Sequence, residues 1–375
     1  MMFPDRSTRR LSQVVVMMVA VLSGCASRPS AAVLDPVHPA NLPEKRIVML
    51  TATNRDSLGP SRGFGVNWAQ SVAYQSYEMS VPPAHKPATI EYPKDRPDPQ
   101  QQFVVTRRQD LSEAGFVAAA ANSVGPDGSV QIYVHGYNNS FQEALYREAQ
   151  VTADSGLQDP IMFSWPSQAS IVGYVADRDA VLYSRHDLQT VVAALSSAKK
   201  IKRIVLFGHS MGGFLVMEVV RQLKLEHRED VIGKLQVVLA SPDIDVDVFR
   251  SQLKEIGKLK YPPTLLISKV DRALAVSSFL GGERPRVGRL DVSDPRIQQA
   301  ALENDITLID LTSLKATDGV GHDRFASLAR FAKQLEALDR TPAAAASRVG
   351  TFVFDAAGAA VSSPFRLAST VVSGK

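Results

Sequence analysis

The sequence has 375 residues, of which 45% are hydrophobic and 21% are charged, with a formal net charge of +4 and a single cysteine, Cys25. This composition is typical of a folded globular protein and excludes a fully disordered or collagen-like chain. A single cysteine also excludes an intrachain disulfide, a CxxC redox site and a zinc site built from cysteines.

Residues 1–24 have the pattern of a signal peptide. Three arginines in the first ten residues precede an apolar stretch from Val14 to Leu22, which is too short to span a bilayer as a stable helix. The sequence Leu-Ser-Gly-Cys that ends at Cys25 resembles a bacterial lipobox, in which the cysteine thiol receives a lipid. The alternative is an ordinary secretory peptide with a chance cysteine. Ala26 follows, and the resemblance to Gram-negative lipoproteins implies an outer-membrane protein on the periplasmic side of the envelope.

Cleavage before Cys25 would remove three Arg and one Asp and lower the net charge from +4 to +2. The remaining Lys and Arg residues form no clustered face, so we expect no nucleic-acid partner. Residues 25–45 hold several Pro, Ala and Ser and few large apolar side chains, which predicts a tether. A strand is expected at Arg46–Thr51, and residues 56–100 contain no good helix. Short strands are expected at Ser76–Val81 and Phe103–Thr106.

From residue 130 onward, short apolar segments alternate with helical ones. We expect strands at Val130–Val134, Ile161–Phe163, Arg203–Phe207, Leu235–Ala240, Thr264–Ser268 and Thr307–Leu311. Helices are expected at Phe141–Ala153, Asp177–Leu195, Met211–Leu225, Val246–Ile256 and Arg324–Leu338. This order predicts an α/β fold over residues 46–340, a mostly parallel sheet with helices on both faces and no large cap domain. Residues 341–375, rich in Ala, Ser and Gly, are expected to form a loosely ordered tail, with a short strand at Thr351–Phe354.

The strongest motif is Gly-His-Ser-Met-Gly at 208–212, which follows an apolar strand and opens a helix. This is the setting of a G-x-S-x-G nucleophile elbow. The glycines allow neighbouring backbones to approach a serine that stands on a strained turn. We therefore predict that Ser210 is a nucleophile; a glycine-rich turn with a buried serine is the alternative.

A second motif, Val-His-Gly-Tyr at 134–137, also ends a strand ahead of a helix. Acyl transfer places negative charge on the carbonyl oxygen, which two fixed backbone N–H groups can stabilise. We expect these donors to be the N–H groups of Tyr137 and Met211. His135 is expected to hold its loop by hydrogen bonds. Ser140 and Glu143 have the spacing of a capping box.

A serine on such an elbow is followed along the chain by an acid and then a histidine. Only His227 and His322 follow Ser210; His227 lies in a charged helix end, whereas His322 lies in a glycine-containing loop after the last predicted strand. We therefore predict that His322 is the base. Two aspartates at strand ends are candidates for the acid that orients His322. Asp271 is favoured because it follows the penultimate strand, and Asp243 is the alternative. Asp310, inside an apolar strand, is expected to make a structural contact.

Taken together, these motifs resemble a bacterial family of α/β hydrolases of unknown function whose members are often lipoproteins. The resemblance covers residues 46–338 and is carried by the segments at 52–55, 134–141, 163–167, 208–212, 241–245 and 268–274. It implies the α/β-hydrolase fold but no substrate. Gly213 departs from the family, in which Asn is frequent at this position. Trp165, at a strand end, is a candidate for lining the pocket.

We therefore expect a lipid-anchored serine hydrolase that cleaves a carboxylic ester or a related acyl bond through an acyl-enzyme. Ser210, Asp271 and His322 would be catalytic, and the substrate would be a small molecule or a lipid with an acyl group. No metal or organic cofactor is implied. One alternative is a non-catalytic envelope lipoprotein that uses a hydrolase fold for binding. Another is a peptidase or thioesterase with the same three residues.

Overall fold

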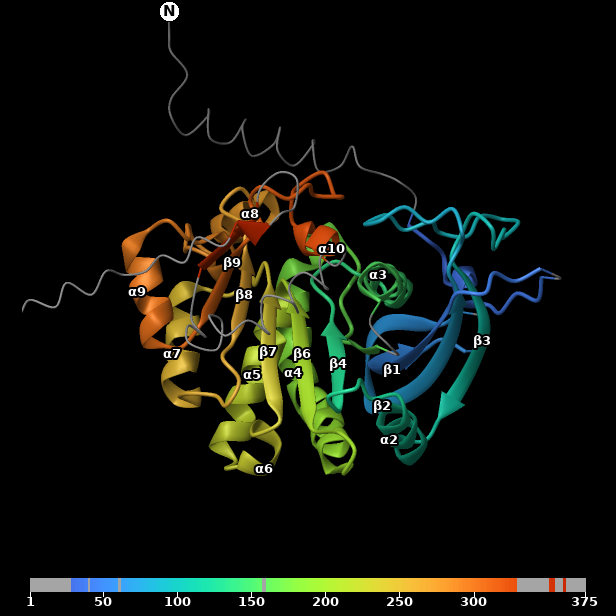
Figure 1. Ribbon diagram of the computed structural model, residues 1–375, viewed down its shortest axis with the longest axis horizontal. Helices are drawn as coiled ribbons and strands as arrows, with labels where there is room; N and C mark the ends of the chain where they lie inside the picture. The colour runs from blue at the N-terminus through green and yellow to red at the C-terminus, as the bar shows by residue number, and fades with distance from the viewer. Residues whose placement is uncertain are drawn as a thin grey trace, which may run out of the picture.

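The computed structural model describes residues 28–328, except for 40, 60–61 and 157–159, together with the strand segments 351–354 and 360–361. The predicted signal peptide, Cys25 and most of the predicted tail lie outside the described residues. All the strands in these residues join one 11-stranded sheet with the order β11-β10-β9-β8-β7-β6-β4-β5-β1-β2-β3. Figure 1 shows this sheet in the middle of the molecule, with helices in front of it and behind it.

The central part of the sheet is parallel, as predicted. It contains β4 (Ser129–Val134), β5 (Ile161–Ser164), β6 (Arg203–His209), β7 (Leu235–Ala240), β8 (Thr264–Ile267) and β9 (Thr307–Asp310). These strands are short and almost wholly apolar because helices bury both of their faces. Their carboxyl ends meet at one edge, the upper edge in Figure 1, which we call the catalytic edge because the residues predicted to be catalytic follow these strands.

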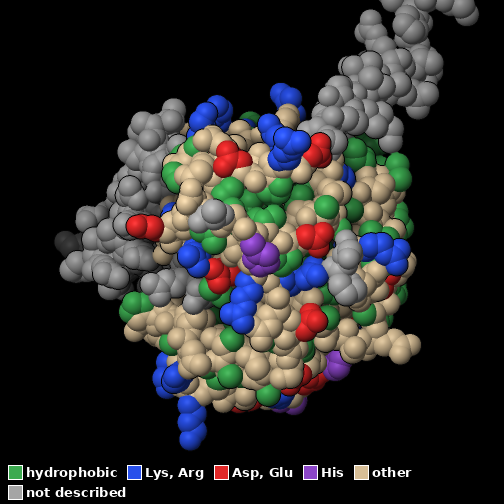
Figure 2. Space-filling view, turned by 90° about the vertical axis from the view of Figure 1, so that its right-hand side faces the viewer, with side chains coloured by type: hydrophobic (Ala, Val, Ile, Leu, Met, Phe, Trp, Pro, Cys, Tyr) green, Lys and Arg blue, Asp and Glu red, His purple; other side chains and the backbone are tan. Residues whose placement is uncertain are grey.

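The amino-terminal part of the sheet differs from the prediction. Strands β1 (Arg46–Ser57), β2 (Phe64–Ser80) and β3 (Val104–Leu111) pair antiparallel, and β2 alone has 17 residues. We expected only short strands here because polar and aromatic residues interrupt the apolar pattern. Much of β2 is only half-buried, so it tolerates that mixture. Figure 2 views this end of the molecule, where basic and acidic side chains are interspersed.

Helices connect the successive strands of the sheet from β3 to β9, and another follows β9. They are α2 (Glu113–Asn122), α3 (Phe141–Ser155), α4 (Tyr174–Ser197), α5 (Met211–Leu225), α6 (Glu229–Ile232), α7 (Val246–Ile256), α8 (Arg272–Leu280), α9 (Pro295–Glu303) and α10 (Arg324–Leu328). The described part of the chain also has the short 3₁₀ helices η1 (Ala31–Leu34), η2 (Ile171–Gly173) and η3 (Val287–Arg289). The capping box at Ser140 and Glu143 is confirmed at the start of α3. No helix within the described ranges is both long and apolar enough to cross a membrane.

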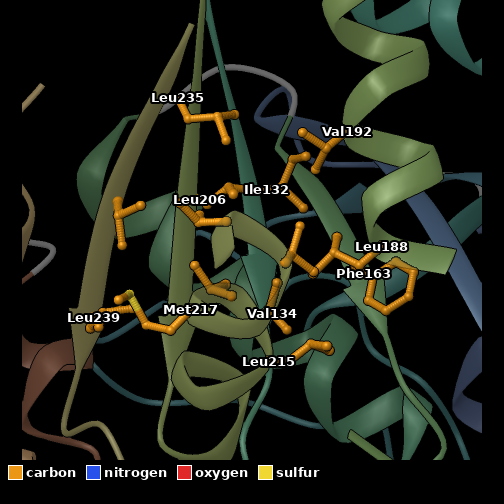
Figure 3. Close-up of a cluster of buried hydrophobic side chains, with 14 of the residues drawn as sticks. Ile132, Val134, Phe163, Leu188, Val192, Leu206, Leu215, Met217, Leu235 and Leu239 are labelled. Atoms are coloured by element: carbon orange, nitrogen blue, oxygen red, sulfur yellow. The ribbon is translucent and has the colours of Figure 1, made fainter. Parts of the chain in front are cut away.

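Alternate strand residues build two hydrophobic cores, one on each face of the sheet. Ile132 and Val134 face the core that α4 and α5 cover, which Figure 3 shows with Leu188 and Leu215 packed against them. Tyr133, between them in sequence, faces the other core, which is covered by α3, α10 and η1. The two-sided core fixes the register of each strand, because a shift by one residue would exchange its faces.

Residues 25–45 were expected to form a tether, but the described part of this segment is attached to the domain. Leu34 of η1 is fully buried, and the Tyr146 hydroxyl of α3 donates to the Val33 carbonyl over 2.7 Å. The N–H of Val37 donates to the carbonyl of Val105 in β3 over 2.9 Å. At the other end of the chain, β10 (Thr351–Phe354) pairs with β9 where a short strand was expected, and β11 (Ala360–Val361) pairs with β10.

Candidate active site

Ser210 lies on the turn between β6 and α5, with φ 54° and ψ −120°. Such a backbone conformation is strained for a non-glycine residue and persists only where neighbours hold it. Here the Ser210 N–H donates to the Ala240 carbonyl over 2.9 Å, and the Ser210 carbonyl accepts from the N–H groups of Gly213 and Asp243. A Cβ on Gly208 would lie 2.7 Å from the Gly213 Cα, and a Cβ on Gly212 would overlap the His135 carbonyl oxygen, so the elbow needs glycine at positions 208 and 212.

The loop after β4 passes directly beside Ser210. A Cβ on Gly136 would lie 2.9 Å from the Ser210 Cβ, so only glycine allows this approach. Tyr137 follows, and Asn138 adopts the left-handed conformation with φ 61°. Met211 is the first residue of α5, so its N–H has no partner within the helix. In the described part of the chain, no protein acceptor takes the N–H of Tyr137 or of Met211.

His322 meets Asp271 across two loops at the catalytic edge. Its Nδ1 lies 2.7 Å from Asp271 Oδ2, while Asp271 Oδ1 accepts from the N–H of Leu274 over 2.9 Å and caps α8. Asp271 is fully buried, and 14% of the His322 side chain is exposed. The Asp318 carboxylate accepts from the His322 N–H over 3.0 Å and fixes the loop that carries the imidazole.

Burial opposes the charged form of His322, but the nearby Asp271 carboxylate, its hydrogen bond and the charges of Asp318 and Asp243 outweigh that effect. The net result is a pKa above the ordinary value. With Nδ1 held by Asp271, the Nε2 atom is the one left for proton transfer. The ring of His209, the residue before Ser210, lies 4.7 Å from the His322 ring between centroids.

No hydrogen bond joins the Ser210 hydroxyl to His322 among the described residues. Such contacts in ligand-free active sites are often long and tighten when substrate binds. Ser210 itself is only 3% exposed. The structure thus brings the predicted nucleophile, base, acid and both backbone donors to one edge of the sheet.

Asp243, the alternative candidate for the acid, has different partners. It accepts hydrogen bonds from the hydroxyls of Tyr174 and Ser277 and forms a buried ion pair with Arg286, whose Nε lies 3.2 Å away. The structure therefore places Asp271, and not Asp243, on the imidazole of His322. The other candidates lie elsewhere: His227 is exposed at the end of α5, and Asp310 accepts from the N–H of Thr312.

His135 holds its loop by hydrogen bonds, as expected. It is fully buried, its Nδ1 lies 2.8 Å from the Gly136 carbonyl, and its Nε2 lies 3.1 Å from the Ser164 hydroxyl, which can donate to it. Burial, with the charge of Arg55, lowers the pKa of His135 to about 3, so the ring is neutral. Trp165 is also fully buried and donates from Nε1 to the His135 carbonyl. It therefore packs behind the loop, whereas we had considered it as a lining of the pocket.

Arg55 is the residue near the site that sequence reasoning assigned no role. Its side chain is almost fully buried, and its guanidinium donates to Ser164 Oγ and to the carbonyls of Gly65, Ser167 and Asn139 at 2.8–3.1 Å. Burial lowers the pKa of Arg55 to about 9. The only sequence signal was its place in the Ala-Thr-Asn-Arg segment at 52–55.

Two solved structures of hydrolase-related proteins are similar to this chain at low sequence identity. A putative hydrolase from Agrobacterium vitis is 13% identical, with 72% of this chain and 95% of that chain covered and a TM-score of 0.35. A lipase-esterase related protein from Clostridium acetobutylicum is 13% identical over 57% of this chain and 97% of that one, with a TM-score of 0.33. Because identities and TM-scores are this low, we draw no conclusion about activity from them.

One curated relative, an uncharacterized protein of Nostoc sp., is 30% identical over 79 residues, which are 20% of this chain and 21% of that protein. The match thus spans about a fifth of the relative's length. The family described as alpha/beta hydrolase of unknown function (DUF900) matches residues 118–338, more than half of the chain. These residues include every predicted catalytic and oxyanion position. The chain therefore belongs to this family of α/β hydrolases of unknown function.

Proposed function

We propose that the protein is a serine hydrolase that cleaves a carboxylic ester or a related acyl bond through an acyl-enzyme. The observation that carries the proposal is the 2.7 Å contact between His322 Nδ1 and Asp271 Oδ2 at the edge where the strained Ser210 stands. A loop histidine and a helix-capping aspartate, 51 residues apart, have no need to meet at a serine elbow for folding alone. Their meeting supports catalysis over a purely binding function.

In the proposed reaction, His322 Nε2 takes the hydroxyl proton of Ser210 while Ser210 Oγ attacks the carbonyl carbon. The resulting oxyanion accepts hydrogen bonds from the N–H groups of Tyr137 and Met211. The bond to the leaving alkoxy group then breaks as His322 returns its proton to that oxygen. Water, activated by His322, attacks the acyl-enzyme in the same way and releases the acid and the free serine.

Each donor in an oxyanion hole contributes about 10²–10³-fold to the rate of such reactions. Asp271 keeps the proton of neutral His322 on Nδ1 and stabilises the imidazolium that forms. Since the raised pKa of His322 makes it a better proton acceptor, the geometry and the electrostatics favour the same role.

Labelling with a fluorophosphonate probe tests this proposal on the full chain in mild detergent, with Ser210→Ala as the control. We expect labelling of the native protein and none of the variant, followed by turnover of p-nitrophenyl esters. Absence of labelling in a protein that circular dichroism shows to be folded would refute the nucleophile. That result would favour the alternative of a non-catalytic lipoprotein that uses the fold for binding. Amide or thioester turnover faster than ester turnover would favour a peptidase or thioesterase.

We also propose that the mature chain begins at Cys25 and is held by its lipid to the periplasmic side of the outer membrane in a Gram-negative host. The support is the lipobox-like sequence and the absence of any other cysteine. Metabolic labelling with a palmitate analogue, lost in Cys25→Ser, together with fractionation of inner and outer membranes, tests this assignment. Labelling that persists in Cys25→Ser would refute it.

A further inference from the structure

The chain segment that follows Cys25 is bound at the catalytic edge. Arg28, three residues after Cys25, donates from Nη1 to Glu143 Oε2 over 2.9 Å and from both terminal nitrogens to the Asn138 carbonyl over 3.3 Å. Asn138 directly follows Tyr137, the predicted oxyanion donor. Three residues reach at most about 11 Å, so a lipid on Cys25 would lie close to this loop.

The contacts continue along the segment after Arg28. The Gln142 side-chain amide donates to the Pro29 carbonyl over 2.9 Å, and further along α3 the Tyr146 hydroxyl donates to the Val33 carbonyl. The next residue, Leu34, is fully buried in the hydrophobic core. An anchor at Cys25 would therefore be joined to the domain by a short, attached segment, and it would hold the catalytic edge in a definite orientation.

Exposed apolar side chains gather at the same edge, and we call them the apolar rim. They come from η2, the start of α4, and α8: Ile171 (41% exposed), Val172 (86%), Val175 (74%), Val276 (37%), Phe279 (52%) and Leu280 (57%). Single exposed apolar residues need no explanation, but a group of six beside a site does. Figure 1 shows α8 at the catalytic edge.

Contacts tie the two parts of the rim to each other and to the site. The Tyr174 hydroxyl lies 2.8 Å from Ser277 Oγ, which joins the start of α4 to α8. The Tyr137 ring lies 5.4 Å from the Tyr174 ring, and the Tyr137 hydroxyl donates to the Ile171 carbonyl. The amino-terminal residue of α8 follows Asp271. The rim thus adjoins both the oxyanion loop and the acid.

We propose that the catalytic edge lies against a lipid bilayer, held there by the lipid on Cys25 and by the apolar rim, and that the substrate is an acyl ester of a membrane lipid. This inference rests on the proposed serine hydrolase activity and on the proposed lipid at Cys25. One acyl chain binds a membrane only marginally, so stable attachment needs a second contribution, and the rim supplies it. In this orientation an acyl ester can reach Ser210 from the bilayer without crossing water.

The experiment compares two substrates of the full chain, a fluorogenic acyl phospholipid in phosphatidylcholine vesicles and a soluble short-chain p-nitrophenyl ester. Rates are expressed per fluorophosphonate-reactive molecule, so that unfolded protein does not count. Phe279→Asp and Val172→Asp alter the rim. The matched control is Leu225→Asp, because Leu225 is 51% exposed, like Phe279, but lies at the far end of α5 from Ser210.

Burial of one large apolar side chain is worth about 1.5–3 kcal/mol, or about tenfold or more in binding. We expect the ratio of vesicle rate to soluble rate to fall at least about tenfold in each rim variant and to stay unchanged in Leu225→Asp. An unchanged ratio in the rim variants, or an equal fall in the control, would overturn the proposal.

Flotation with vesicles separates this proposal from the hydrolase assignment, because it needs no catalysis. In the Ser210→Ala background, we expect Cys25→Ser to weaken flotation and Phe279→Asp to weaken it further. If both substrates fail and no serine is labelled, the hydrolase proposal falls while flotation still reports on the rim. If rim variants float like the parent, the rim is covered by another part of this chain or by another protein, and the lipid-facing orientation is wrong.

Discussion

Replacement of Asp271 with asparagine would separate its two structural roles. One carboxylate oxygen caps α8 by accepting from the Leu274 N–H, and the other holds Nδ1 of His322. An asparagine has only one oxygen. If that oxygen keeps the cap, the NH₂ group faces His322 Nδ1, which must then accept and so loses its proton to Nε2. An imidazole with its proton on Nε2 cannot take the proton of Ser210.

The cap decides which way the amide points. Loss of a helix N-cap costs about 1 kcal/mol, or about a fivefold preference for the orientation that keeps it. A wrongly protonated histidine in this arrangement lowers kcat by about 10⁴-fold. In the minority orientation the amide oxygen accepts from Nδ1, but a neutral amide lacks the negative charge that stabilises the imidazolium, so we expect Asp271→Asn to lose about 10³–10⁴ in kcat. The free energy of unfolding should change by about 1 kcal/mol or less, since the cap is kept.

Asp243→Asn is the matched comparison, because it changes the alternative candidate for the acid in the same way. Breaking a buried ion pair costs about 3–5 kcal/mol, so this variant should lose stability through Arg286. Its kcat per fluorophosphonate-reactive molecule should stay within about tenfold of the parent, because His322 keeps its partner. Ester turnover and urea unfolding of both variants measure these effects. Loss of activity in Asp243→Asn with activity kept in Asp271→Asn would refute the assignment.

Three further predictions concern pH. Activity needs neutral His322, whose pKa is raised, so kcat/KM should fall with decreasing pH through a value above 6.5, measured as a pH–rate profile. Burial raises the pKa of Glu148 to about 8, so folding stability should decrease as pH rises from about 4.5 to 8; Glu148→Gln should abolish this slope in urea unfolding. Burial opposes protonation of His85, but Asp154 and Glu91 raise its pKa overall. Its stabilisation is therefore complete below pH 6.5 and lost as pH rises through the raised pKa, so His85→Ala should destabilise more at about pH 5 than at about pH 9.

The parallel sheet and the elbow could be predicted because their signals are local. A short apolar run predicts β6, and the Gly-His-Ser-Met-Gly sequence that follows predicts the turn at Ser210. The residues that specify both are neighbours in the sequence. The same holds for β4 and the Gly136 turn. Such patterns need no knowledge of which distant segment packs against them.

The acid could not be settled because its choice depends on a contact between distant loops. Asp243 and Asp271 both follow parallel strands, and each is buried. What distinguishes them is the loop from Leu311 to His322, which returns over α8 so that the Arg272 N–H donates to the Val320 carbonyl. Nothing in the composition of that loop specifies this path. For the same reason, the attachment of residues 28–37 to α3 and β3 was not evident from a segment rich in Pro, Ala and Ser.

Arg55 shows how distant motifs become one unit. Three segments that carried the family resemblance are far apart in the sequence but meet at this guanidinium. They are residues 52–55, 134–141 and 163–167. Burying a cation costs several kcal/mol, which is tolerable only where carbonyl and hydroxyl oxygens replace its water. Register shifts on both sides of Arg55 in β1 break the regular pairing where the Arg55 side chain donates to the Asn139 carbonyl in the loop after β4. The buried charge therefore ties β1, β5 and that loop together, which gives the Ala-Thr-Asn-Arg segment a positioning role beside the catalytic edge.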